Sequence, residues 1–163
     1  MIKKKVLLVE DSLTVRKIIS YSLIRLGLNV IEANDGVEAI EKIYSEKPDL
    51  VLLDITIPKI SGYDVCTKIK SDPKTQDIPV IFCTSKDDEK DYYEATKYGI
   101  DGYLSKPFQH SEILAMMTEL GITQAGIYQD KYTPTLKKGC IRLIEPISEN
   151  YINEDYINKF AYR

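Results

Sequence analysis

Short apolar runs alternate with amphipathic segments along residues 1–120 of the chain. The runs cover residues 5–10, 29–33, 50–54, 78–84 and 102–106, and each has the length of one strand. The run at 50–54 is continuously apolar until its last residue, Asp54. A continuous run is typical of a strand that is buried on both faces of a sheet.

The segments between these runs carry apolar residues at helical spacing. The first segment stops at Gly27, a residue type that favours the C-terminal cap of a helix. Asp35 and Glu38 have the spacing of a capping box and predict the start of a second helix. Three more helical segments follow Gly62, stop at Gly99 and cover residues 113–120.

This alternation predicts an α/β fold with a doubly wound, five-stranded parallel sheet and helices on both faces. The chain has 163 residues, which suits one domain with an appendage. We expect a domain over residues 1–120 and a short C-terminal extension over residues 121–163.

Composition and charge narrow the class of protein. The 44% hydrophobic and 29% charged content is typical of a soluble globular protein, and the net charge of -3 is too small to indicate nucleic-acid binding. Cys66, Cys83 and Cys140 are far apart without CxxC spacing, so disulfides and structural zinc are not expected, in keeping with the cytoplasm. No segment approaches the roughly 18 apolar residues of a membrane span, so membrane insertion is not expected.

Polar side chains follow the predicted strands at their carboxyl ends. The first predicted strand ends in Glu10 and Asp11, the third in Asp54, the fourth in Thr84, and the fifth in Lys106. Open parallel sheets bind ligands at this edge, so we expect these groups to converge. Crowded carboxylates repel unless a cation lies among them, and a solvent-open oxygen site suits Mg²⁺.

The lysine indicates that a further negative group joins the acids and the metal. A phosphoryl group on Asp54, acting as an in-line nucleophile, would supply that charge. Lys106 would then neutralise one phosphoryl oxygen, and Thr84 would donate a hydrogen bond to another.

At these residues the sequence resembles the receiver domain of two-component response regulators, over about residues 4–120. The motifs are "LLVEDS" with the acidic pair, "LLDITIPKISG" with Asp54, "FCTS" with Thr84, and "GYLSKPF" with Tyr103 and Lys106. The resemblance is closest to stand-alone receivers of the chemotaxis and twitching-motility types. It implies a flavodoxin-like strand order of 2-1-3-4-5.

The resemblance also implies roles for single residues. Mg²⁺ would be held by Asp11, Asp54 and the backbone carbonyl of Thr56, with Glu10 acting through water. The Lys106–Pro107 bond would be cis. Thr84 and Tyr103 would form a switch, in which Thr84 moves toward the phosphate and Tyr103 turns inward.

By the same resemblance, the protein would act in a phosphorelay and would not be an enzyme with turnover. A histidine kinase or histidine phosphotransfer domain would donate the phosphoryl group. The phosphoprotein would then present a changed surface, formed by the last two helices and the last strand, to a downstream protein.

Three alternatives remain open from the residues. A phosphatase with an aspartyl nucleophile usually has a second acid two residues after it, where this chain has Thr56. A flavin carrier needs a glycine- and hydroxyl-rich loop after the first strand, and "EDSLTVRK" is not one. A scaffold that acts through its C-terminal extension would not need the complete set of site residues.

The extension differs in character from the rest of the chain. It is too short for the usual DNA-binding module, and its six basic and five acidic residues give no electrostatic footprint for DNA. We therefore predict no direct contact with nucleic acid. Residues 140–144 could form a short strand, and Ile152, Tyr156 and Phe160 could line a short helix that docks on the domain or on a partner.

Overall fold

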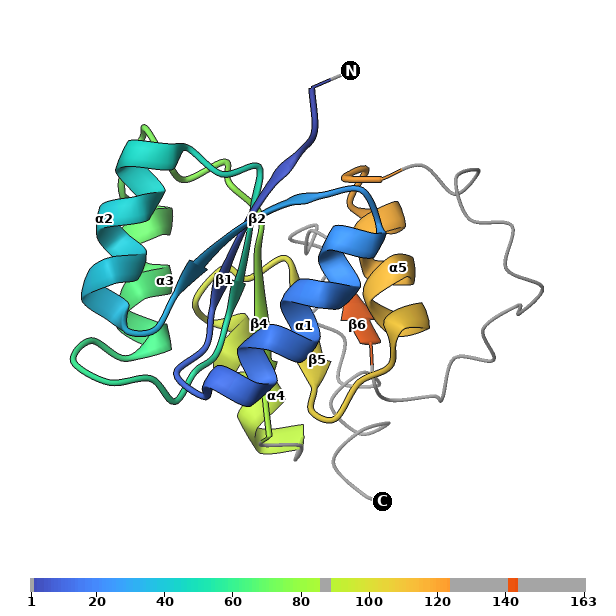
Figure 1. Ribbon diagram of the computed structural model, residues 1–163. Helices are drawn as coiled ribbons and strands as arrows, with labels where there is room; N and C mark the ends of the chain where they lie inside the picture. The colour runs from blue at the N-terminus through green and yellow to red at the C-terminus, as the bar shows by residue number, and fades with distance from the viewer. Residues whose placement is uncertain (1, 86–88, 124–140, 144–163) are drawn as a thin grey trace.

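The computed structural model describes residues 2–85, 89–123 and 141–143. Strands and helices alternate through the first part of the chain, as predicted (Figure 1). The strands are β1 (Lys5–Val9), β2 (Asn29–Ala33), β3 (Leu50–Leu53), β4 (Val80–Thr84), β5 (Gly102–Ser105) and β6 (Ile141–Leu143). The helices are α1 (Leu13–Arg25), α2 (Gly36–Glu46), α3 (Gly62–Ser71), α4 (Glu89–Thr96) and α5 (His110–Glu119).

The sheet has the order β2-β1-β3-β4-β5-β6. The first five strands pair in parallel, so the predicted order 2-1-3-4-5 is confirmed. β6 pairs antiparallel with β5, and its Arg142 lies opposite Tyr103. The short strand predicted within residues 140–144 is therefore present, but its place in the sheet was not predicted. The helix proposed from Ile152, Tyr156 and Phe160 lies outside the described residues.

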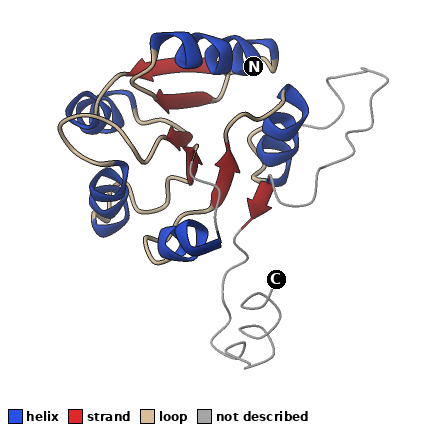
Figure 2. Ribbon diagram, turned by 90° about the horizontal axis from the view of Figure 1, so that it is seen from below, coloured by secondary structure: helices blue, strands red, loops and turns tan. Residues whose placement is uncertain are grey.

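Helices cover both faces of the sheet, as Figure 2 shows from below. Side chains of α1 and α5 pack on one face in a core with Leu50, Leu52 and Ile81. Side chains of α2, α3 and α4 pack on the other face with Val51 and Leu53. Consecutive residues of β3 thus enter opposite cores, which explains its continuous apolar run.

Strand β4 starts later than predicted, because Pro79 lacks a backbone N–H. The run from residue 78 starts as strand β4 only at Val80. Pro79 has no N–H to donate to a neighbouring strand, although its carbonyl accepts the N–H of Val51 at 2.9 Å.

Among the described residues, no helix has the length and apolar character needed to cross a membrane.

The start of α2 contains the predicted capping interaction in a slightly different form. Asp35 Oδ1 accepts the N–H groups of Val37 and Glu38, each at 2.9 Å. The Glu38 carboxylate reaches back to the N–H of Asn34, at 2.9 Å, rather than to that of Asp35. The other carboxylate oxygen of Glu38 pairs with Lys42 at 2.5 Å.

We expect Glu38→Gln to lower stability in a pH-dependent way. The hydrogen bond from Lys42, and then that from Asn34, lower the pKa of Glu38 below its ordinary 4.5. A lowered pKa adds stability above pH 4.5 that is lost as the pH falls through the lowered value. The loss on substitution is about 0.5 kcal/mol at pH 7 and vanishes in acid. Urea unfolding at pH 7 and in acid, below the lowered pKa, measures this loss of stability, with the exposed Glu41→Gln as the control.

Candidate functional site

The carboxyl ends of β1 and β3 bring three acids together. Glu10, Asp11 and Asp54 each offer a carboxylate oxygen, and these oxygens lie within 4.8 Å of one another. Glu10 and Asp54 are buried, at 2% and 7% exposure, while Asp11 is exposed. β1 and β3 are direct neighbours in the sheet, so the predicted convergence of these acids is confirmed.

Lys106 extends from the end of β5 into this acidic cluster. Its Nζ donates to Asp54 Oδ2 at 2.7 Å and also contacts Glu10 Oε2. The Lys106 backbone N–H donates to the Thr84 carbonyl at 2.7 Å, and the Lys106–Pro107 bond is cis, as predicted. One ammonium group thus bridges two buried carboxylates.

Burial and pairing act in opposite directions on these charges. Burial raises the pKa of Glu10, and the hydrogen bonds from Lys106 and from the Ser12 N–H offset this only in part. Burial alone would lower the pKa of Lys106, but its hydrogen bonds to Asp54 and Glu10 outweigh this and raise it. The lysine therefore remains charged at neutral pH. A further cation near Glu10 and Asp54 would stabilise their ionised forms.

The backbone around Asp54 is held firmly. Its N–H donates to the Val9 carbonyl at 3.0 Å, and its Oδ1 accepts the N–H of Thr56 at 2.9 Å. Gly62, at the start of α3, comes so close that a Cβ atom there would lie 2.4 Å from the Asp54 carbonyl oxygen. Both oxygens of the Asp54 carboxylate accept hydrogen bonds, which fixes the orientation of the group.

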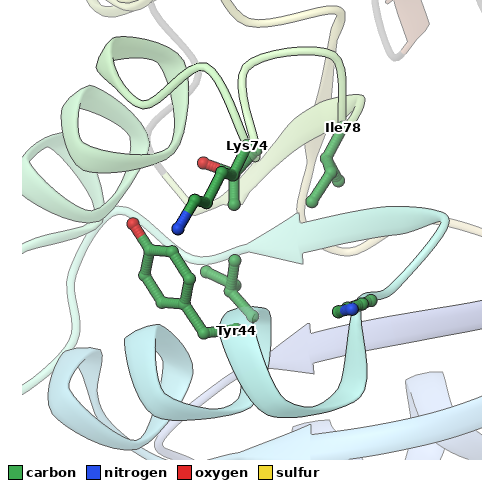
Figure 3. A pocket seen from close by; sticks show the side chains of 6 residues that line it. Tyr44, Lys74 and Ile78 are labelled. Atoms are coloured by element: carbon green, nitrogen blue, oxygen red, sulfur yellow. The ribbon is translucent and has the colours of Figure 1, made fainter.

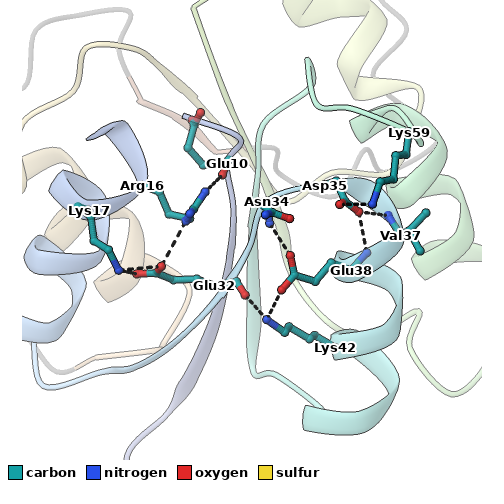
Figure 4. Close-up of polar contacts among 10 residues, drawn as sticks. All are labelled: Glu10, Arg16, Lys17, Glu32, Asn34, Asp35, Val37, Glu38, Lys42 and Lys59. Carbon is teal, nitrogen blue, oxygen red and sulfur yellow. Dashed lines mark hydrogen bonds and ion pairs between the residues drawn. The ribbon is translucent and has the colours of Figure 1, made fainter. Parts of the chain in front are cut away.

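The loop after Asp54 is also fastened to the start of α2. The Gly36 N–H donates to the Pro58 carbonyl at 3.2 Å, and Lys59 Nζ pairs with Asp35 Oδ2 at 2.6 Å (Figure 4). Lys59 adopts a left-handed conformation with φ of 68°. The sequence analysis interpreted Asp35 only as a helix cap and did not foresee that it also holds this loop.

Thr84 and Tyr103, the predicted switch residues, are both buried, at 1% and 3% exposure. Thr84 ends β4 opposite Ser105 of β5, next to Lys106. The Tyr103 ring meets the ring of Tyr92 from α4 edge to face, with centroids 5.5 Å apart. The ring of Tyr103 is therefore already inward in this structure.

The ligand atoms at this site suit a hard divalent cation. The candidate side-chain ligands are all carboxylate oxygens, and Asp11 leaves the site open to water. Thr56 lies two residues after Asp54 in the same loop. Oxygen ligands, few in number and open to solvent, are those that Mg²⁺ prefers.

A cavity of about 610 Å³ lies elsewhere, between the end of α2 and the loop that precedes β4 (Figure 3). Its lining residues are Ile43, Tyr44, Lys47, Lys74, Thr75 and Ile78. The Tyr44 hydroxyl donates to Asp72 at 2.6 Å beside it. No residue of the acidic cluster lines this cavity, so the candidate site is the open edge at Asp54.

Comparisons with known proteins agree with this geometry. Residues 6–118 match the response regulator receiver domain family. PhoP of Bacillus subtilis (strain 168), named as the alkaline phosphatase synthesis transcriptional regulatory protein, is 31% identical over 160 residues, which are 94% of this chain and 66% of PhoP. The "Probable transcriptional regulator ycf27" of Guillardia theta is 41% identical over 113 residues, which are 69% of this chain and 43% of that protein.

Two solved structures have a similar fold. The chemotaxis response regulator CheY4 of Vibrio cholerae has a TM-score of 0.69 and 26% identity, covering 73% of this chain and 99% of CheY4. The receiver domain of sensor histidine kinase PA1611 from Pseudomonas aeruginosa PAO1 gives the same TM-score and identity, covering 74% and 99%. That receiver structure has a magnesium ion coordinated in its active site cleft.

The chain spans less than two thirds of the length of PhoP and of ycf27. Both relatives are named as transcriptional regulators. The narrower prediction of a stand-alone chemotaxis or twitching-motility type is therefore not confirmed.

Proposed function

Because the chain belongs to the response regulator receiver domain family, we propose that Asp54 is the residue on which it accepts a phosphoryl group. The observation that carries this proposal is the contact of Lys106 with Asp54 inside the acidic cluster. The donor is a phosphohistidine of a kinase or of a histidine phosphotransfer domain.

In this reaction an oxygen of Asp54 attacks the phosphorus in line with the P–N bond of the donor. The new O–P bond forms as the P–N bond breaks. The electron pair of the P–N bond leaves with the imidazole nitrogen, which takes up a proton. Lys106 neutralises a phosphoryl oxygen, and Thr84 donates its hydroxyl to another. The two hydrogen bonds that hold the Asp54 carboxylate support this role, because they orient the attacking group.

Mg²⁺ would be held by Asp11, Asp54 and the Thr56 carbonyl, with Glu10 acting through water. When bound, it neutralises charge shared by the carboxylates and the phosphoryl group. Lys106 pairs with both Glu10 and Asp54, so one cation faces two buried carboxylates and a second cation would balance their charge. The magnesium ion in the PA1611 receiver domain supports this assignment.

Phosphorylation then switches a protein-binding surface formed by α4, β5 and α5. Thr84 moves toward the phosphate, and Tyr103 adjusts behind it. The ring of Tyr103 is already buried without phosphate, so the proposed change is a tightening of its inward position rather than a full rotation. A bias of a few kcal/mol suffices for such a change.

The exposed face of α1 supports a protein as the donor. This helix starts two residues after Asp11 and exposes four large apolar side chains to solvent, namely Leu13, Ile18, Tyr21 and Ile24. Large apolar side chains on a surface beside a reactive group favour contact with another protein. We propose that the protein takes the phosphoryl group from this donor and passes the signal to a downstream protein, both in the cytoplasm.

Incubation with Mg²⁺ and a small phosphodonor, followed by intact mass measurement, tests the proposal. We expect one added phosphoryl group that does not appear when a chelator is present. Turnover of many donor molecules per protein each second would favour the phosphatase alternative. No label under any donor would favour a scaffold that acts through residues 121–163.

We also propose that residues 1–120 form the receiver domain and that residues 121–163 form a C-terminal extension that adds β6 to the sheet and makes no contact with nucleic acid. A chain ending at residue 123 should be labelled as fast as the full chain, because Asp54, Lys106 and Thr84 all precede that point. Its melting temperature should fall slightly, because β6 is lost from the sheet. Loss of labelling on truncation would contradict this division, and DNA binding by the full chain in a gel shift would contradict the second part.

A further inference from the structure

Arg16 of α1 contacts the acidic cluster through the main chain. Its Nη1 donates to the carbonyl oxygen of Glu10 at 2.7 Å, and its Nε donates to Glu32 Oε2 at 3.2 Å (Figure 4). The side chain is only 13% exposed. One guanidinium group therefore joins the end of β1 to β2.

The contacted carbonyl belongs to the peptide that links Glu10 to Asp11. The N–H of Glu10 donates to the Ala33 carbonyl at 3.0 Å, and the Glu10 carbonyl is held by Arg16. These two bonds fix the backbone from which both acids project. Both acids therefore project from a segment of backbone that Arg16 helps to hold.

Glu32 is the anchor for Arg16. Burial alone would raise the pKa of Glu32, but hydrogen bonds with Lys17, Ser20 and Arg16 outweigh it and lower the pKa. Glu32 is therefore a carboxylate at neutral pH. Its backbone carbonyl also accepts a hydrogen bond from Lys42 at 2.5 Å, which ties this part of β2 to α2.

We propose that Arg16 is a positioning residue that presets Glu10 and Asp11 for a divalent cation by holding the carbonyl between them. This inference rests on the proposed Mg²⁺ site. A lysine could not replace Arg16, because the two hydrogen bonds leave from different nitrogens of the planar fork.

Charge alone predicts the opposite effect. Arg16 is a cation near a cation site, so its removal should strengthen Mg²⁺ binding if only Coulomb repulsion mattered. If Arg16 acts by positioning, its removal should weaken binding. The sign of the change therefore separates the two explanations.

The test is a Mg²⁺ titration of the full chain and its variants, followed by the amide NMR signals of the loops at Asp11 and Asp54. We expect Arg16→Met and Arg16→Lys to weaken binding about tenfold, as loss of an outer-shell partner does. The matched control is Lys17→Met, which removes a cation from the same Glu32 without touching Glu10. It should change binding by less than about twofold.

Melting curves show whether each variant is folded at the titration temperature. If Arg16→Met is unfolded there, Arg16→Lys alone is used for the comparison with wild type. Arg16→Met combined with Glu32→Gln should bind Mg²⁺ as the Arg16 single variant does, because the two residues act as one unit. Wild-type protein that binds no Mg²⁺ would overturn the proposed function. Wild-type protein that binds, with folded Arg16 variants that bind equally or more tightly, would overturn this inference alone.

Discussion

The Asp54→Asn variant is expected to take up no phosphoryl group from any donor. Asparagine has nearly the same shape, and its amide oxygen can still accept the N–H of Thr56, so the loop should keep its geometry. It lacks the negative oxygen that attacks phosphorus. Intact mass after incubation with Mg²⁺ and a small phosphodonor measures the loss, which should be complete within detection.

The matched control is Asp49→Asn at the opposite end of the same strand. Asp49 directly precedes β3, where its carboxylate accepts the Lys5 N–H at 2.8 Å and pairs with Lys4 at 3.2 Å. This variant should be labelled like wild type. Undiminished labelling of folded Asp54→Asn would place the acceptor on another residue and contradict the proposed function.

The Gly62→Ala variant is expected to lose about 3 kcal/mol of stability. Helix propensity alone predicts the reverse, because alanine is favoured over glycine in a helix by about 1 kcal/mol. The added Cβ would lie 2.4 Å from the Asp54 carbonyl oxygen and 2.7 Å from Ile55 Cα, and backbone atoms cannot move aside as a side chain does. Either α3 or the strand end at Asp54 must shift.

Urea unfolding measures this loss, and labelling of the folded fraction shows whether the Asp54 backbone has moved. We expect slower labelling as well. The control is Gly27→Ala. An added Cβ there would meet no atom of another residue within 4 Å, its chain neighbours aside, but φ is +79°, so only about 1 kcal/mol of stability should be lost. A Gly62→Ala variant as stable as wild type would mean that the close approach relaxes without cost.

The sequence predicted the five parallel strands well, because the apolar runs of β1, β3, β4 and β5 mark strands buried by two layers of helices, while the edge strand β2 is only partly buried. It also predicted that Asp54 and Lys106 meet, since parallel strands deliver their last residues to one edge. The motifs around these residues then indicated the chemistry. These signals are local in sequence, so a reading along the chain finds them.

Contacts between distant segments could not be predicted in the same way. The bond from Arg16 to the Glu10 carbonyl depends on the angle at which α1 leaves the sheet, and a basic residue on a helix ordinarily indicates a solvated face. Gly36 suits a helix start, but only the structure shows that a Cβ there would lie 2.2 Å from the Ile60 carbonyl oxygen. Packing of this kind leaves no periodic pattern.

The pairing of β6 with β5 has a consequence for self-association. A sheet edge with unpaired N–H and C=O groups can recruit a strand from another molecule, which is a common start of aggregation. In the described part of the chain, β6 covers the β5 side, and β2 forms the opposite edge. A shortened chain without residues 141–143 would bare the backbone beside Tyr103, so concentrated stocks of it should become turbid sooner than those of the full chain.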